Sequence, residues 1–111
     1  MKVINKTLLA TFRVAGKCEA CGKWCNERDP HHVFSKGAGR VDARLNLIAL
    51  CRLCHNGFHA SGKPSRAELL VIVGKREGKT PEDIEDFVYR VRRDSRCKIW
   101  IVDEKTNKEP D

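Results

Sequence analysis

Histidines are concentrated in one stretch of this 111-residue chain. All four of them, His31, His32, His55 and His59, lie between positions 31 and 59, and the last two are four residues apart. On a helix, residues four apart share one face, so His55 and His59 can hold a single ion between their rings. A neutral imidazole, whose pKa is about 6.5, can also take a proton from water at physiological pH. The cluster therefore favours metal-assisted hydrolysis with a histidine as the base.

Two cysteine pairs bracket the first two histidines. Cys18 and Cys21 form one C-x-x-C pair, and Cys51 and Cys54 form another. Two residues between cysteines allow both thiolates of a tight turn to face one ion, and two such pairs complete the tetrahedral site that structural zinc favours. We therefore expect a closed four-cysteine zinc site. It would join the turn before the paired histidines to the start of the helix that carries the later two, so that metal binding is part of folding.

Two further cysteines leave alternatives open. Cys25 is close enough to Cys21 to share a metal with it, but we interpret Cys25 and Cys97 as spare thiols. The simpler alternative to a zinc site is a set of reduced cysteines buried as small apolar side chains. Disulfides are less expected, because a reducing compartment keeps thiols free.

Composition and charge favour a nucleic-acid partner. The chain has a formal net charge of +7, and charged residues make up 33% of it against 6% aromatic residues. A basic domain suits a polyanion such as DNA, and a core so poor in aromatics usually needs a staple such as a structural metal. No apolar run approaches the roughly 20 residues that span a bilayer, and no signal-peptide pattern is visible. We expect a cytoplasmic protein with no membrane partner.

Hydrophobic periodicity predicts the elements that position these residues. A short helix is expected over residues 6–15, with Thr7 as its N-cap and Gly16 as its end. A buried strand is expected over 45–50, and a helix over 51–60. The latter would carry His55 and His59 on one face.

Capping signals predict two more helices. Ser65 and Glu68 fit a capping box, and Thr80-Pro81 supplies an N-cap and a first-turn proline ahead of an apolar stripe that we interpret as core packing. A late strand is expected over 97–102 and a disordered polar tail over 103–111.

The order of residues around the histidines carries a further signal. His31-His32-Val33-Phe34 is followed by a run from Asn46 to His55 and then by His59. This order resembles the HNH endonuclease family, in particular small phage and bacterial members with a cysteine-bound zinc. The resemblance implies an α+β fold, a small zinc-stabilised ββα-metal (HNH, His-Me finger) core with flanking helices. Residues 1–102 would form one nuclease domain, with the motif core at 18–60 and a helical extension at 64–94.

The resemblance also implies a role for each polar residue of the motif. His32 would be the general base, and Asn46 would hydrogen-bond across the loop to hold it. His31, His55 and His59 would be the ligands of a catalytic divalent ion. Because imidazole nitrogen suits Mn²⁺, Co²⁺ and Ni²⁺ better than Mg²⁺, we expect the first three to support higher activity. The implied function is a metal-dependent DNA endonuclease in the cytoplasm of a bacterial or phage-infected cell.

Basic residues in and around the motif are candidates for binding DNA phosphates: Lys36, Arg40, Arg44 and Arg52, followed by Lys63 and Arg66. Nothing resembles a base-reading module, so we expect low sequence specificity. One such site per chain cuts one strand and a dimer is needed to cut two, so the sequence leaves nicking and double-strand cutting both open. One alternative is a non-catalytic zinc ribbon that binds nucleic acid or a partner protein, and another is a purely structural or regulatory zinc protein. A ribbon would bind one zinc per chain, whereas the enzyme would bind an additional, exchangeable ion.

Overall fold

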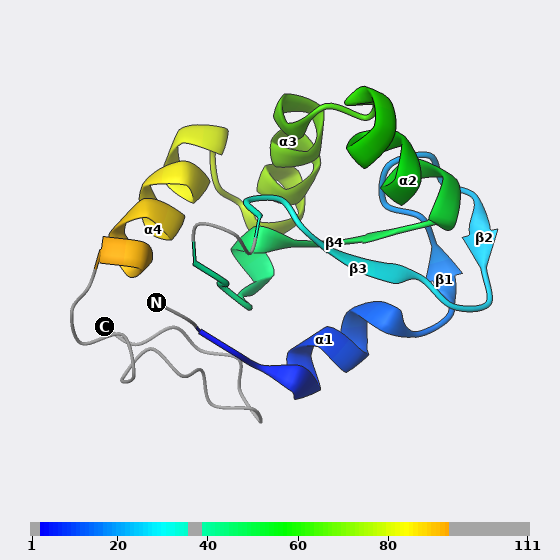
Figure 1. Ribbon diagram of the computed structural model, residues 1–111, viewed down its shortest axis with the longest axis horizontal. Helices are drawn as coiled ribbons and strands as arrows, with labels where there is room; N and C mark the ends of the chain where they lie inside the picture. Colours follow the sequence, from blue (N-terminus) through cyan, green and yellow to red (C-terminus); the bar gives the residue numbers. More distant parts are fainter. Residues whose placement is uncertain (1–2, 36–38, 94–111) are drawn as a thin grey trace.

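The computed structural model describes residues 3–35 and 39–93. Within these ranges the chain forms four α-helices, two small antiparallel sheets and a short 3₁₀ turn (Figure 1). In chain order the elements are α1 (Lys6–Arg13), β1 (Gly16–Lys17), β2 (Trp24–Cys25), β3 (Asp29–His32), the 3₁₀ turn η2 (Arg44–Asn46), β4 (Leu47–Leu50), α2 (Arg52–Ser61), α3 (Arg66–Glu77) and α4 (Pro81–Arg93). The expected strand over 97–102 and the expected tail over 103–111 lie outside the described residues.

The hairpin of β3 and β4 forms the centre of the fold. The two strands are antiparallel, with Asp29 opposite Leu50 and His32 opposite Leu47. Alternate residues of a strand point to opposite faces, and here both faces are covered. Leu47 packs against α1, whereas Ile48 and Leu50 join a larger core formed with α3 and α4. In Figure 1, α1 lies on one side of the hairpin, and α2 and α3 lie on the other.

The two C-terminal helices share that larger core with the hairpin. The predicted apolar stripe of α4 is buried, as expected, and consists of Ile84, Phe87, Val88 and Val91. Leu69 and Val73 of α3 have no exposed surface and pack in the same cluster. The helical extension therefore forms part of the core that supports the histidine region.

Local capping explains where the helices begin and end. The predicted capping box of α3 is present: the Glu68 amide donates to Ser65 Oγ at 3.2 Å, and the Ser65 amide donates to Glu68 Oε1 at 3.1 Å. Thr80 caps α4, since its Oγ1 accepts a hydrogen bond from the Asp83 amide. Gly62 ends α2 in the left-handed region with φ 72°, which a glycine adopts without strain.

Three predictions at element boundaries were wrong. Asn5, and not Thr7, caps α1, because Asn5 Oδ1 accepts from the Leu8 amide at 2.9 Å. The helix ends at Arg13, two residues earlier than expected, since Val14 is already extended and leads into β1. The predicted strand over 45–50 begins only at Leu47, because residues 44–46 form a 3₁₀ turn.

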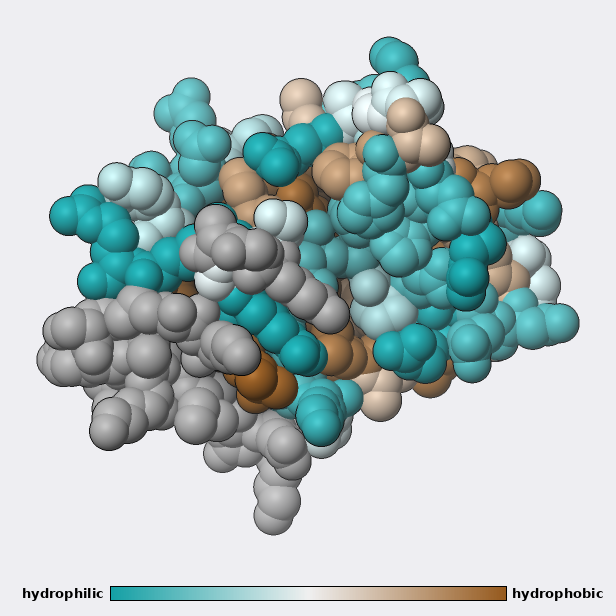
Figure 2. All heavy atoms as spheres, in the orientation of Figure 1, coloured by the Kyte–Doolittle hydropathy of each residue, from teal (hydrophilic) through white to brown (hydrophobic). Residues whose placement is uncertain are grey.

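The surface of the described part is largely polar. Hydrophilic side chains cover most of the described surface on the face shown in Figure 2. None of the helices within residues 3–35 and 39–93 is long and apolar enough to cross a membrane.

Candidate metal centre and histidine site

Four cysteine thiols meet at the start of α2. The Sγ atoms of Cys18, Cys21, Cys51 and Cys54 all lie within 4.8 Å of one another, and those of Cys21 and Cys51 are 3.8 Å apart. The first pair lies in the turn between β1 and β2, and Cys51 is the N-cap of α2, with its Sγ accepting from the Cys54 amide at 3.4 Å. Four thiols in this arrangement are the donor set of a structural zinc ion.

The crowding of these thiols favours a bound cation. Burial, followed by contacts with Cys51, Cys21 and Cys18, raises the pKa of the Cys54 thiol. At Cys18 burial also opposes ionisation, but backbone amides outweigh it and lower the pKa to about 7. Neighbouring thiolates repel each other, and a divalent ion would allow all four to ionise together. Cys25 lies outside the cluster and donates its thiol hydrogen to the Lys23 carbonyl, whereas Cys97 lies outside the described residues.

Three of the four histidines converge between β3 and α2. His31 projects from β3, and His55 and His59 follow each other by one turn on α2. One ring nitrogen from each lies within 4.8 Å of the others, and the ring centroids are 5.0 to 5.4 Å apart. Phe58 packs against the His31 ring at 4.5 Å between centroids. The strand and the helix thus bring together three imidazoles that could hold one ion.

His31 is the most informative member of this trio. It is only 3% exposed, and among the described residues its Nε2 atom has no hydrogen-bond partner. Burial, reinforced by the charges of His55 and His59, lowers the pKa of His31 to about 4. The ring is therefore neutral at physiological pH, and a buried polar atom without a partner is costly. A metal ion at the centre of the trio would satisfy that atom.

A carboxylate orients the second imidazole. Asp29 precedes His31 by two positions on β3, so the two side chains share the face of the strand that packs on α2. The Asp29 Oδ2 atom lies 3.0 Å from His55 Nδ1 and 2.8 Å from Arg52 Nε. Burial opposes ionisation of Asp29, but the hydrogen bonds from His55 and Arg52 outweigh it and lower its pKa. This contact leaves Nε2 of His55 available as a ligand, as in many metal sites.

The remaining histidine is held by a second carboxylate. His32 Nε2 lies 2.7 Å from Asp42 Oδ1, and Asp42 has no exposed surface. Asp42 also accepts hydrogen bonds from the Arg40 guanidinium and, at 2.8 Å, from the Asn5 amide. Burial opposes its ionisation, yet these hydrogen bonds lower the pKa of Asp42 to about 2. An anionic Asp42 keeps the proton on Nε2 of His32, which leaves Nδ1 as the basic atom.

Asn46 bonds across the loop, as expected, but not to His32. Its side-chain amide donates to the carbonyls of Phe34 at 3.2 Å and Val41 at 3.0 Å, and its Oδ1 accepts from the Phe34 amide at 2.8 Å. The backbone carbonyl of Asn46 accepts from the Val33 amide. Asn46 therefore closes the two ends of the loop that follows β3, and Asp42 is the residue that contacts the imidazole of His32.

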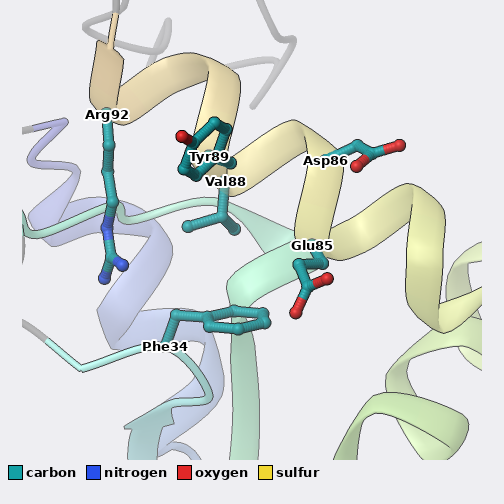
Figure 3. Close-up of a pocket in the computed structure, with 6 residues that line it drawn as sticks. All are labelled: Phe34, Glu85, Asp86, Val88, Tyr89 and Arg92. Carbon is teal, nitrogen blue, oxygen red and sulfur yellow. The ribbon is translucent and has the colours of Figure 1, made fainter.

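All four histidines border one cavity of about 340 Å³. Phe58 and Arg66 also line it, so the cavity has an apolar wall and a cation beside the imidazoles. A larger cavity of about 470 Å³ lies against α4, and its lining includes Phe34, Glu85 and Arg92 but no histidine (Figure 3). The histidines that the sequence predicts to be functional therefore line the smaller cavity.

The predicted phosphate-binding residues have other partners. Arg40 pairs with Asp42, Arg44 Nη2 lies 2.8 Å from Glu77, and Arg52 pairs with Asp29. Lys36 lies outside the described residues. These three arginines stabilise the site and its supports, and their charges are partly neutralised by carboxylates.

Sequence reasoning missed two residues of this site, namely Asp29 and Asp42, and considered Arg66 only as a basic residue that follows the motif. A signal for Asp29 was present, because its spacing of two from His31 places both on one face of a strand. Asp42 lies in an irregular loop, where no periodicity indicates which way a side chain points. Arg66 begins α3, and its approach to the histidine cavity depends on how that helix packs.

Comparison with known proteins adds one distant similarity. The chain is 39% identical over 54 residues to the type IV methyl-directed restriction enzyme EcoKMcrA of Escherichia coli (strain K12). The match covers 41% of this chain. It covers only 20% of the length of that relative. No protein-family model matches the chain. No solved structure matches it either. Similarity to a restriction enzyme points at most to nuclease activity, and it carries no information on sequence specificity or metal preference.

Proposed function

We propose that this chain is a metal-dependent DNA endonuclease of the HNH type, with β3, β4 and α2 as its ββα-metal core. The observation that carries this proposal is the buried, unpartnered Nε2 atom of His31, which lies beside the ring nitrogens of His55 and His59. A zinc ribbon alone would account for the cysteines but would leave this atom without a function. The distant similarity to a restriction enzyme supports the same reading.

His31, His55 and His59 would hold the catalytic ion, and the four clustered cysteines would hold a structural zinc. When bound at the histidines, a divalent ion supplies Lewis acidity and neutralises charge on the phosphate and on the leaving oxygen. Because the donors are imidazole nitrogens, we expect Mn²⁺, Co²⁺ or Ni²⁺ to serve better than Mg²⁺. Asp29 would fix the orientation of the His55 ring by accepting a hydrogen bond from its Nδ1–H group.

His32 would be the general base. Asp42 holds its Nε2 proton, so Nδ1 can take a proton from a water molecule in the cavity. The water oxygen forms a new bond to phosphorus, the bond from phosphorus to the 3′ oxygen breaks, and the released 3′ oxygen takes up a proton from solvent. Asn46 keeps the loop closed behind the base and so maintains its position.

The same proposal extends to the substrate and the domain. Because the described residues show no base-reading element, contacts to DNA would be mainly to phosphates and sequence specificity would be low. A single site per chain would nick one strand. The hairpin shares one core with α3 and α4, which supports a single nuclease domain over residues 1–102. We propose that this domain acts in the cytoplasm of a bacterial or phage-infected cell.

Conversion of supercoiled plasmid by the purified protein tests the proposal. The assay is run at low salt with Mn²⁺, Co²⁺, Ni²⁺, Mg²⁺ or no added divalent ion, using the wild type, His32→Ala and a matched surface variant, Lys75→Ala on α3. We avoid a chelator, because it would also remove a zinc ion from the cysteines. Metal content is measured in parallel, so that zinc and the exchangeable ion are counted separately.

We expect nicked plasmid only with an added ion, faster with Mn²⁺, Co²⁺ or Ni²⁺ than with Mg²⁺, and only in the wild type and Lys75→Ala. A wild type that leaves the plasmid intact with every ion, while it binds one zinc and DNA, would establish a binding module instead. Equal or higher rates with Mg²⁺ would argue against a three-histidine site.

A further inference from the structure

Two arginines from the C-terminal helices reach the segment that follows β3. Arg66, the first residue of α3, donates from Nε to the Val33 carbonyl at 3.3 Å. Arg92, on α4, donates from Nε to the Gly39 carbonyl at 2.9 Å and from Nη2 to the Ser35 carbonyl. Both guanidinium groups therefore lie over the same stretch of backbone, although they come from different helices.

Phe34 lies beside both arginines, because its ring faces Arg66 and lines the same cavity as Arg92. The guanidinium carbon of Arg66 lies 5.1 Å from the centroid of the Phe34 ring. Figure 3 shows Arg92 extending from α4 toward the segment that carries Phe34. Burial, together with the positive charge of Arg66, lowers the pKa of Arg92, which agrees with two guanidinium groups that lie near each other. The aromatic ring and the backbone carbonyls hold these side chains in place.

In the part of the chain that the structure describes, neither arginine is paired with a carboxylate. Arg40, Arg44 and Arg52, in contrast, each have an acidic partner. Glu85 and Asp86 line the cavity beside Arg92, but among the described residues neither forms an ion pair with it. Two neighbouring positive charges that form no ion pair favour an anion between them. A guanidinium has five N–H donors in a fixed fork that suits phosphate, and the hydrogen bonds to the backbone carbonyls use one donor of Arg66 and two of Arg92.

We infer that Arg66 and Arg92 form a phosphate clamp, which binds the DNA backbone next to the phosphodiester that the histidine site cuts. Arg66 lines the histidine cavity, and Arg92 lines the neighbouring cavity on the other flank of the same segment. A strand that crosses Val33, Phe34 and Ser35 would thus meet the imidazoles and the two guanidinium groups in succession. The inference rests on the proposed function, because it takes DNA as the ligand.

The salt dependence of DNA binding tests the clamp. Binding of a short labelled duplex is followed by fluorescence anisotropy over a salt series, without added divalent ion, for the wild type, Arg66→Gln, Arg92→Gln and the double variant. Matched controls are Lys75→Gln on α3 and Arg90→Gln on α4, which remove the same charge from exposed positions of the same helices. Each lost phosphate contact should reduce the slope of log affinity against log salt by about 0.9.

We expect a reduced slope and weaker binding for each clamp variant, additive in the double variant, and wild-type slopes for the two controls. Glutamine keeps a donor for the backbone carbonyls but removes the charge. Thermal unfolding is measured on every variant to check that its fold is retained. Slopes equal to those of the controls would overturn the clamp and leave the arginines as supports of the segment, whereas the proposed function would still be decided by plasmid nicking with the wild type. A wild type that binds no DNA would refute the proposed function as well.

A measurement on the wild type covers the case in which a variant fails to fold. Phenylglyoxal modifies accessible arginines, and mass spectrometry identifies which ones react. We expect duplex DNA to protect Arg66 and Arg92 from modification more strongly than it protects Arg90. Equal reactivity of Arg66 and Arg92 with and without the duplex, under conditions where the protein is saturated with DNA, would overturn the inference.

Discussion

The Nε2 atom of His32 lies 2.7 Å from Oδ1 of Asp42, a carboxylate with no exposed surface. Arg40 and the Asn5 amide bind the same carboxylate, so its position is determined from three directions. This contact favours the tautomer of His32 that carries its proton on Nε2, which leaves Nδ1 as the atom that would act as the base under the proposed function. On the other face of β3, Asp29 makes a similar contact with Nδ1 of His55, which would leave Nε2 of that ring available for the proposed ion.

Replacement of Asp42 by asparagine should impair catalysis without loss of the metal. An amide no longer requires Nε2 of His32 to carry the proton, so we expect the nicking rate at saturating DNA to fall by roughly 10²- to 10⁴-fold, the contribution of a positioned general base. The rate is measured with Mn²⁺, beside Asp86→Asn, an exposed carboxylate of α4. A wild-type rate in a folded Asp42→Asn protein would show that Asp42 does not position the base.

Asp29→Asn should weaken the binding of the catalytic ion. Loss of the carboxylate removes the partner that orients the His55 ring, and such changes typically cost about 10- to 100-fold in metal affinity. Titration with Co²⁺, followed by its absorption spectrum, measures this affinity in a protein whose zinc content is unchanged. If Asp29→Asn binds Co²⁺ as tightly as the wild type and Asp86→Asn, the Asp29–His55 contact does not support a metal ligand.

Cys51→Ser should abolish the stable fold, whereas Cys25→Ser should not. Cys51 belongs to the four-thiol cluster and caps α2, and Cys25 lies outside the cluster. Binding of a structural zinc contributes on the order of 10 kcal/mol, comparable to the whole stability of a small domain. Zinc content and thermal unfolding measured side by side distinguish the two variants. A zinc-free Cys25→Ser protein would instead place Cys25 among the ligands.

Acid should weaken the fold through Asp42. Its pKa falls from 3.8 to about 2 on folding, because the hydrogen bonds from His32, Arg40 and the Asn5 amide outweigh burial. A depressed folded pKa means that the carboxylate stabilises the fold fully above about pH 5 and loses this contribution as the pH falls toward 2. A shift of this size corresponds to a contribution by Asp42 on the order of 2 kcal/mol to the free energy of unfolding.

The difference in the free energy of urea unfolding between the wild type and Asp42→Asn isolates this contribution. It should be constant above about pH 5 and shrink as the pH falls further, down to the lowest pH at which both proteins are folded. Taking the difference cancels the groups that both proteins share, such as His31, whose pKa is lowered to about 4. A difference that does not change with pH would contradict the lowered pKa of Asp42.

The local elements of this fold were predictable because their causes are local. The capping box of Ser65 and Glu68 and the apolar stripe of α4 depend on residues three or four positions apart, which a helix brings together wherever it lies. The helix α1 was also predicted, but its N-cap was wrong for the opposite reason. Asn5 caps that helix while its amide binds Asp42, 37 positions away, and no local pattern contains that contact.

The sequence by itself determined which residues could do chemistry: the paired cysteines, and the histidines that share one face of α2. Only the tertiary structure decided their partners. Asp29 meets His55 across 26 positions, Asp42 meets His32 through an irregular loop, and Arg40, Arg44 and Arg52 pair with carboxylates rather than remaining free. Spacing along a chain determines which side chains one helix or strand presents together, whereas contacts between distant segments depend on how the elements pack in the core.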